Sequence, residues 1–323
     1  MFNLEIKMIT LSKVPALLLM STVFATGAAQ ADVLDLSGLV GNSNLYSLHN
    51  IVVSGNSIGG GIAAAGNISG SSYNIGKGAY GNYSVIAGNN FTYSNGSIAG
   101  GYYAGGTATI APSTNLAKTP ASAAPAMSFA STSSDVAKTS SSIGALTATG
   151  SAQVLNKWSP NQVTLTSGAG GAKSVEVFNM TASQFASINN LQSTLDSSIT
   201  KTLIFNLSGD ANWGNMSMDV LSGYNVLFNF TNAQHVNFNS ISVLGSVLAP
   251  NAVIGGSNGG ITGTVVAGDW NANLTLGNKA FVASDVAGFV SAVPEPETYA
   301  MLLAGLGLVG FAARRRKNKA AAA

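Results

Sequence analysis

Few side chains in this sequence could carry acid–base, nucleophilic or metal chemistry. The 323 residues include two histidines, no cysteine and twelve carboxylates. His49 and His235 stand apart, and the sequence places no partner beside either at the spacing of a metal or acid–base pair. We interpret both as surface or strand-packing side chains. Without cysteine, disulfides and thiolate metal sites are excluded.

The nine carboxylates between the two terminal segments are scattered. They are Asp32, Asp35, Asp135, Glu176, Asp196, Asp210, Asp219, Asp269 and Asp285. Folding could still assemble two of them into a glycosidase pair, so a polysaccharide-acting enzyme is kept as an alternative. Asp210 and Asn212 offer two oxygens to calcium, but no further acidic ligand follows them. We therefore predict a non-enzymatic protein with no catalytic residue, metal or cofactor.

Charge is scarce along the whole chain. Asp, Glu, Lys and Arg make up 8% of the residues, against about 25% in an ordinary soluble domain. Residues 32–293 hold seven lysines and nine acids, a net charge of −2, and the other basic residues lie in the terminal segments. This body cannot offer nucleic acid a basic face. Its surface must be built from neutral Asn, Ser and Thr, which favours adhesion or matrix contact over catalysis.

A cluster of tyrosines is the best candidate for ligand binding. The candidates for stacking against a ligand are Tyr80, Tyr83, Tyr93, Tyr102 and Tyr103, among Gly, Asn and Ser. Aromatic rings beside neutral hydrogen-bonding groups suit stacking on an exopolysaccharide or contact with a matrix protein. The alternative is that the rings fill the interior of the fold.

The N-terminal segment, residues 1–31, has the features of a secretory signal peptide. Lys7 and Lys13 are followed by an apolar run over residues 14–28, and Ala29 and Ala31 provide small residues for cleavage. We expect the Sec translocon and signal peptidase to act here, leaving Asp32 as the first mature residue. An uncleaved membrane anchor is the alternative.

The C-terminal segment, residues 293–319, has three parts. Val293, Pro294, Glu295, Pro296 and Thr298 form a polar motif, residues 299–313 are apolar, and a basic stretch over 314–319 opens with Arg314, Arg315 and Arg316. A helix over residues 298–313 would span about 24 Å, short of the ~30 Å hydrocarbon core. Snorkelling arginines could make up the difference. We predict a single transmembrane helix with the body outside the inner membrane.

This order of parts resembles the PEP-CTERM sorting signal of Gram-negative bacteria. The resemblance covers the V-P-E-P-x-T motif, the apolar helix and the arginines. It implies that an exosortase recognises the tail, and that the protein is anchored transiently in the inner membrane before reaching the cell surface or extracellular matrix. An ordinary tail anchor would explain the helix and the arginines but not the proline motif.

A recurring unit predicts the architecture of the body. Small residues follow short apolar runs, with Ala65, Ala87 and Ala104 aligned at spacings of 22 and 17, and Ala249 and Ala267 at 18. Short strands with small residues at the corners and a period of 17 to 22 are typical of stacked coils. We therefore predict a mainly β, right-handed β-helix or solenoid-like domain over residues 32–292. A β-sandwich with glycine-rich hairpins is the alternative.

One or two helices are expected beside the strands. Residues 107–152 form an Ala-, Ser- and Pro-rich insert, or a helix with apolar positions at Phe129, Val136, Ile143 and Leu146. A second helix is predicted over 181–196 from the capping pattern of Thr181 and Gln184. Strands are predicted over 203–207 and 226–230.

The body also resembles the choice-of-anchor A domain, through VLFNF at 226–230, GSVLAPNA at 245–252 and GTVVAGDW at 263–270. That family implies a bacterial surface protein of mostly β structure with a suspected adhesion or matrix role, and brings no established catalytic residue. We therefore expect an adhesion- or biofilm-related protein. The alternatives are a polysaccharide-binding or polysaccharide-acting protein, and an ice-binding-type solenoid.

Overall fold

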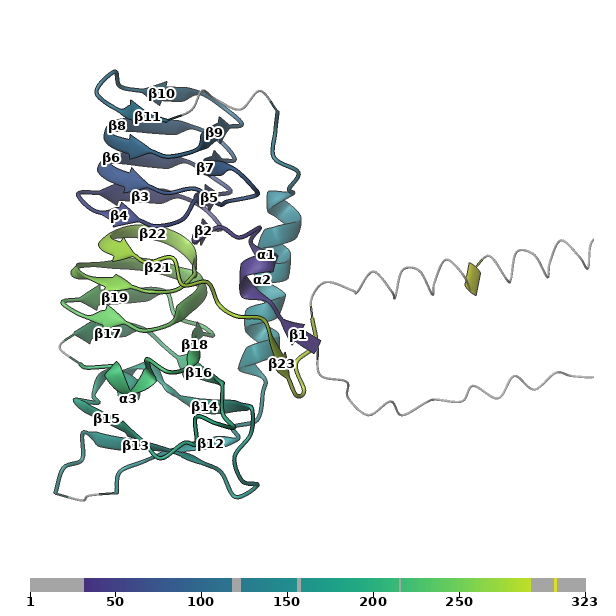
Figure 1. Cartoon of the computed structure of the whole chain (residues 1–323), viewed down its shortest axis with the longest axis vertical. Coiled ribbons are helices and arrows are strands. Elements are labelled where there is room, and N and C mark those ends of the chain that lie inside the picture. The colour runs from purple at the N-terminus through teal and green to yellow at the C-terminus, as the bar shows by residue number, and fades with distance from the viewer. Residues whose placement is uncertain (1–31, 118–122, 156–157, 215, 292–304, 307–323) are drawn as a thin grey trace, which may run out of the picture.

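The structure is a computed structural model that describes residues 32–117, 123–155, 158–214, 216–291 and 305–306. It is mainly β, as predicted, with one tall body and one long helix beside it (Figure 1). The signal peptide, the sorting motif and most of the apolar segment 299–313 lie outside the described residues. No helix within the described ranges is long and apolar enough to cross a membrane.

The body is a stack of turns in which each strand pairs in parallel with the strand of the turn above and below. Eighteen strands form this sheet, and all of the pairings described within it are parallel. Parallel strands joined through corners bury a shared interior. The alternative, a β-sandwich, would instead need antiparallel hairpins.

The strands fall into three columns, each a ladder of parallel neighbours. Column one holds β14 (Val175–Thr181), β16 (Thr202–Ser208), β18 (Asn225–Phe230), β2 (Leu45–Ser47), β5 (Ile62–Ala64), β7 (Tyr83–Ala87) and β9 (Gly101–Ala104). Column two holds β17 (Ala211–Gly214), β19 (His235–Asn239), β3 (Ile51–Ser54) and β10 (Ala108–Ile110). Column three holds β20 (Ser242–Val243), β4 (Ser57–Ile58) and β11 (Asn115–Leu116). Longer strands pass through more than one column: β6 (Ile68–Ile75), β8 (Phe91–Ile98), β21 (Ser246–Ile261) and β22 (Val265–Leu276).

The stack is made of two halves from opposite ends of the chain. The turns from β2 to β11 form one half, and the chain then passes along the stack as α2 (Phe129–Gly144) before returning through β14 to β22 (Figure 1). The halves meet where β22 pairs with β2, β3 and β4, so that Leu45 lies opposite Val265. Nearby, β1 (Asp32–Leu34) pairs antiparallel with β23 (Ser284–Val286) and closes the domain.

The far end of the second half is closed by a separate small sheet. In it β13 (Gln162–Ser167) pairs antiparallel with β12 (Gly150–Gln153) and parallel with β15 (Asn190–Ser193). The antiparallel strand interrupts the parallel pattern, which limits further strand addition at that end.

The interior is filled by like residues stacked from turn to turn. Phe178, Phe205 and Phe228 occupy the same register position, and successive rings stack with centroids 5.1 and 5.2 Å apart. Trp213 and Phe185 pack edge-on or tilted against this stack. Such aromatic pairs contribute about 0.5–1.5 kcal/mol each beyond the area they bury.

The predicted repeats are largely confirmed, with one correction. Ala249 pairs with Ala267, and Ala87 with Ala104, as aligned. The residue opposite Ala87 is Ala64, however, and not Ala65. The alignment by letters was wrong because Ile62, the first residue of β5, lies opposite Val85, and Ala65 already lies beyond the end of β5.

The two predicted helices differ in outcome. A helix within 107–152 is confirmed as α2, with Val136 and Ile143 buried against the sheet. The helix over 181–196 is wrong beyond its first turn: α3 spans only Ala182–Ala186. Its capping box of Thr181 and Gln184 is present. The later apolar residues are buried by a different route, since they lie in and around β15.

The predicted strands over 203–207 and 226–230 are confirmed as parts of β16 and β18. The short helix α1 (Leu36–Leu39) and the 3₁₀ turn Asp219–Leu221 have no counterpart among the elements predicted from the sequence. Asp35 begins α1 by accepting a hydrogen bond from the Gly38 N–H at 2.8 Å.

A ladder of asparagines, of which Asn206 and Asn229 are buried, fixes α2 to the stack. The side-chain Nδ2 of Asn229 donates to Asn206 Oδ1 at 2.9 Å, and that of Asn206 donates to Asn179 Oδ1 at 3.0 Å. The same amides also donate to carbonyls at the end of the helix, Asn206 to Ile143 O at 2.8 Å and Asn229 to Ser140 O at 3.0 Å. Both carbonyls lie near the C-terminal end of α2, so the ladder ties this end of the helix to β16 and β18.

Replacing Asn229 by alanine should therefore destabilise the protein by about 2–3 kcal/mol, because the Ser140 hydroxyl and Asn206 Oδ1 lose a buried partner. The measurement is the midpoint of urea unfolding. Asn239→Ala is the matched control, since this exposed side chain bonds only to another exposed amide, and it should cost under about 0.5 kcal/mol. Equal effects of the two substitutions would contradict the buried ladder.

Candidate binding surface

Each of the two histidines has a carboxylate partner contributed by a neighbouring turn. His49 Nδ1 lies 3.1 Å from Asp269 Oδ2, and His235 Nδ1 lies 3.5 Å from Asp210 Oδ2. Both histidines are exposed, so their interpretation as surface side chains is confirmed, and each has a carboxylate partner that its neighbours in sequence do not reveal. The partners are 220 and 25 residues apart in sequence, and only the stacking of turns brings them together. Both pairs are largely exposed, and the described residues contain no cluster of three metal-ligating side chains.

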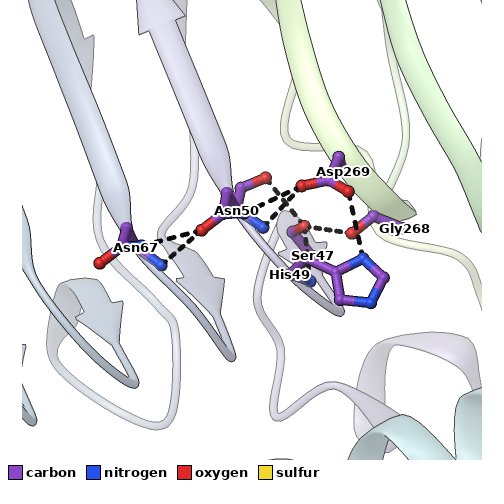
Figure 2. A network of polar contacts seen from close by, with 6 residues as sticks. All are labelled: Ser47, His49, Asn50, Asn67, Gly268 and Asp269. Carbon is purple, nitrogen blue, oxygen red and sulfur yellow. Dashed lines mark hydrogen bonds and ion pairs between the residues drawn. The ribbon is translucent and has the colours of Figure 1, made fainter.

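His49 and Asp269 belong to a ladder that follows one corner of the stack (Figure 2). Asp269 Oδ1 accepts the Asn50 N–H at 3.0 Å, and Asn50 Oδ1 accepts the Asn67 N–H at 2.9 Å. Asn67 Oδ1 accepts the Asn90 N–H at 3.2 Å, and Asn90 in turn accepts from Thr107 N–H at 2.9 Å. We call this set the corner ladder.

The corner ladder explains the small polar residues that recur after each strand. A short side chain with an oxygen acceptor satisfies the backbone N–H of the next turn, which would otherwise have no partner at a corner. Ser47 supports the same corner by donating to Gly268 O at 2.8 Å. The corners therefore hold the turns in register, and the strands that leave them present their outward side chains in straight rows.

The outward side chains of columns two and three form three such rows, which we call the ladder face. The first row is Asn212, Asn237, Gly255, Asn271, Val52, Ser69, Thr92 and Thr109. The second is Gly214, Asn239, Ser257, Asn273, Ser54, Ser71 and Ser94. The third is Ser242, Gly260, Thr275, Ser57, Asn74, Ser97 and Asn115.

None of these positions is charged, and only Val52 is apolar apart from the glycines. The low charge of the sequence is thus most evident on this surface, which carries no Asp, Glu, Lys or Arg. Column one differs, because α2 covers its outward side chains, including Leu248, Val266 and Tyr46. The ladder face, in contrast, is not covered by α2, and its residues are exposed or half-exposed.

Several ladder-face side chains are held by one another across the turns. Asn56, in the loop between β3 and β4, donates through Nδ2 to Asn273 Oδ1 at 2.7 Å and accepts from the Thr275 hydroxyl at 2.6 Å. The Ser97 hydroxyl donates to Asn74 Oδ1 at 2.8 Å. Side chains already held in one rotamer lose less conformational entropy on binding. The face is therefore partly organised before any ligand arrives.

The structure separates the clustered tyrosines. Tyr93 is buried inside the stack, where its hydroxyl donates to the Tyr73 carbonyl and burial raises its pKa to about 12. Its ring is therefore not at the surface, which removes it from the stacking candidates. The reason is its register: it points inward from β8, beside Phe91.

The other four candidate tyrosines are half-buried and lie away from the ladder face. Tyr102 points inward and packs against Phe91, and Tyr103 faces the side of α2. Tyr80 packs with the helices, where burial raises its pKa. Tyr83 donates to Ala123 O at 2.8 Å. Stacking of a ligand on these four rings stays a prediction.

The sequence-predicted processing residues cannot be placed. Ala29 and Ala31, the motif Val293, Pro294, Glu295, Pro296 and Thr298, and the arginines Arg314, Arg315 and Arg316 all lie outside the described residues. The ladder face, in contrast, was missed by the sequence analysis although it is well defined. Alternation of Asn, Ser and Thr with apolar residues in 68–75, 91–98 and 265–276 was the available signal.

Two family matches accompany this geometry. Residues 36–278 match the family described as "Putative Ice-binding-like adhesive domain", and residues 292–317 match the PEP-CTERM protein-sorting motif. The first match spans the whole stack and α2. No curated protein and no solved structure matches the chain.

Asp210 gives the surface a measurable pH dependence. The N–H groups of Gln234 and His235 donate to its Oδ1 at 2.7 and 3.0 Å and hold its pKa below the ordinary 3.8. A lowered pKa in the folded state stabilises the fold above pH about 4, and this stabilisation is lost as the pH falls through the folded pKa. Carboxyl NMR titration should place the pKa of Asp210 below 3.8, and Asp210→Asn should flatten the loss of stability between pH 5 and pH 2. A measured value at or above 3.8 would contradict the assigned hydrogen bonds.

Proposed function

Because the chain belongs to the ice-binding-like adhesive domain family and carries a PEP-CTERM sorting motif, we propose that it is a surface adhesin whose contact surface is the ladder face. The coarser part, an exported surface protein sorted by an exosortase, has the support of both matches. The identity of the contact surface rests on the geometry of the ladder face.

The observation that carries the proposal is the uncharged, partly organised character of this face. A surface of amides and hydroxyls makes many weak, neutral hydrogen bonds, and these lose little strength in salt because no ion pair is involved. A single contact of this kind is worth only about 0.5–1.5 kcal/mol. Many copies displayed on one cell multiply the effect through avidity.

The first and last described strands of the domain, β1 and β23, lie away from this face. In Figure 1, β1 and β23 lie beside α1 and α2, while the strands of columns two and three lie on the other side of the stack. A protein held through its C-terminal segment would therefore be attached on the helix side. The ladder face would point away from the attachment.

We further propose how the protein is exported and what it binds. The Sec translocon and signal peptidase would remove residues 1–31, and residues 299–313 would hold the protein transiently in the inner membrane until the exosortase acts. The partner would be a neutral exopolysaccharide or matrix protein in a biofilm. The body would be a right-handed β-solenoid of the choice-of-anchor A type, and it would act without catalysis, releasing no product from purified matrix.

Ice binding is a second candidate function. It is favoured by the description of the matched family and by Thr92 and Thr109, which lie in register on adjacent turns. The rest of the first row is a mixture of Asn, Ser, Gly and Val, where regular binding to a lattice would favour one repeated side chain. Thermal hysteresis of the purified domain above that of an equal concentration of albumin would support this candidate, and an equal value would remove it.

Sorting is tested in strains with and without the exosortase. With the enzyme present, the protein should lose its C-terminal segment and leave the membrane fraction, as shown by intact mass and fractionation. Changing Pro294 and Glu295 to alanine should reproduce the behaviour of the strain without the enzyme. Identical mass and location in all three cases would sink the sorting proposal.

Adhesion is tested by placing charge on the ladder face. The double variant Thr92→Lys/Asn271→Lys should reduce binding to purified matrix at least tenfold, because two ammonium groups would have to be desolvated against a neutral partner. The control is Ser134→Lys/Ala137→Lys, which adds the same charge to exposed positions of α2. If the control loses as much binding as the ladder-face variant, the contact surface is elsewhere.

A further inference from the structure

A shallow groove lies at one end of the ladder face, where α3 meets β17 and β19. Its volume is about 710 Å³, and it is widely open to solvent. It is lined by Ser183, Ser187, Asp210, Asn212, His235 and Asn237, with Ala186 and Ala211 between them. Every lining residue belongs to a described element or lies next to one.

The fold positions the polar groups of the groove, but not all of their hydrogen-bonding capacity is used within the protein. Asp210 Oδ1 is occupied by the two backbone N–H groups, while its Oδ2 faces His235. Asn212 Oδ1 accepts from Asn239 at 3.1 Å, which leaves its own N–H₂ group to donate. The side chains of Asn237 and Ser183 make no hydrogen bond to any other described residue. The groove therefore offers a carboxylate acceptor, amide donors and acceptors, an imidazole and a hydroxyl.

This combination matches a hydroxyl-rich, uncharged ligand. Neighbouring hydroxyls on a sugar ring both donate and accept, so they can pair with a carboxylate and an amide at once. Ala186 and half-exposed Val253, which lies opposite His235, provide contacts for the C–H faces of a ring. The only acid of the groove, Asp210, would repel an anionic polymer.

The groove is continuous with the ladder face. Asn212 and Asn237 lie opposite each other and begin its first row, which continues through Gly255 to Asn271. A linear chain bound in the groove could extend along this row without meeting a charged side chain. Gly255 has no side chain, so nothing projects from the surface between Asn237 and Asn271 in this row.

We infer that the groove beside α3 is a binding subsite for a neutral glycan chain, which runs from it onto the first row of the ladder face. This rests on the proposed function and names its ligand class. The groove would fix the position of one stretch of the chain, and the ladder face would add weaker contacts along the remainder.

The test is titration of the folded protein with neutral hexasaccharides (cello-, malto-, xylo- and laminarihexaose) followed by NMR, with an alginate hexamer as the anionic comparison. At least one neutral hexamer should bind and shift the amide signals of Asp210, Asn212 and Asn237, and alginate should not. Asn237→Ala and Asp210→Asn should each weaken binding at least tenfold. Asn82→Ala and Asp285→Asn, matched exposed changes away from the groove, should leave it unaltered.

Absence of binding by all four neutral hexamers, or binding that Asn237→Ala leaves unchanged, would overturn the inference. Its failure is distinguishable from that of the adhesin proposal by assaying the same variants on purified matrix. If groove variants adhere normally while Thr92→Lys/Asn271→Lys does not, the ladder face stands and the groove does not. If only alginate binds, the ligand is anionic and the neutral-glycan assignment is wrong.

Discussion

In-register parallel stacking is the constraint on which the rest of this structure depends. Each turn must place its strand over the strand below, and this holds even where the chain is not continuous, as between β2 and β22. Because Leu45 pairs with Val265 on one side and with Ile62 on the other, both in parallel register, the two halves form one stack. The fold therefore depends on this junction together with α2, which connects the halves and is held by the asparagine ladder.

Stacking also determines the surface. An inward position repeated over many turns becomes an apolar column such as the three phenylalanines, and an outward position becomes a row of neutral polar groups. The same rule that builds the core thus builds the ladder face, and a charged residue in such a row would meet its neighbours at the strand spacing of about 4.8 Å. The charged residues that the structure describes lie at the corners, at the end of the stack closed by β12, β13 and β15, and on the side of α2. The ladder face is therefore left as a continuous neutral surface.

Helices and strands were predicted from the sequence more successfully than contacts between residues that are far apart in it. The strands at 203–207 and 226–230 and the helix containing Val136 carry local periodicity and were found. The register of Ala64 against Ala87 was missed by one residue, because Ala65 has the same side chain but already lies beyond the end of β5. The pairing of His49 with Asp269, and the groove around Asp210, could not be predicted locally, since each depends on turns folded from remote segments. The prediction of a helix over 181–196 was wrong because the same spacing of apolar residues is compatible with a short helix followed by a strand, here α3 and β15.

We propose that the ladder face, and not the side of the stack covered by α2, contacts the exopolysaccharide or matrix protein. Since the chain has no cysteine, single variants Ser71→Cys, Thr92→Cys and Ser134→Cys can be labelled selectively with a maleimide while the protein is bound to purified matrix. Binding should slow labelling at positions 71 and 92 and leave position 134 unaffected. Slowed labelling at 134 with unchanged rates at 71 and 92 would contradict the account.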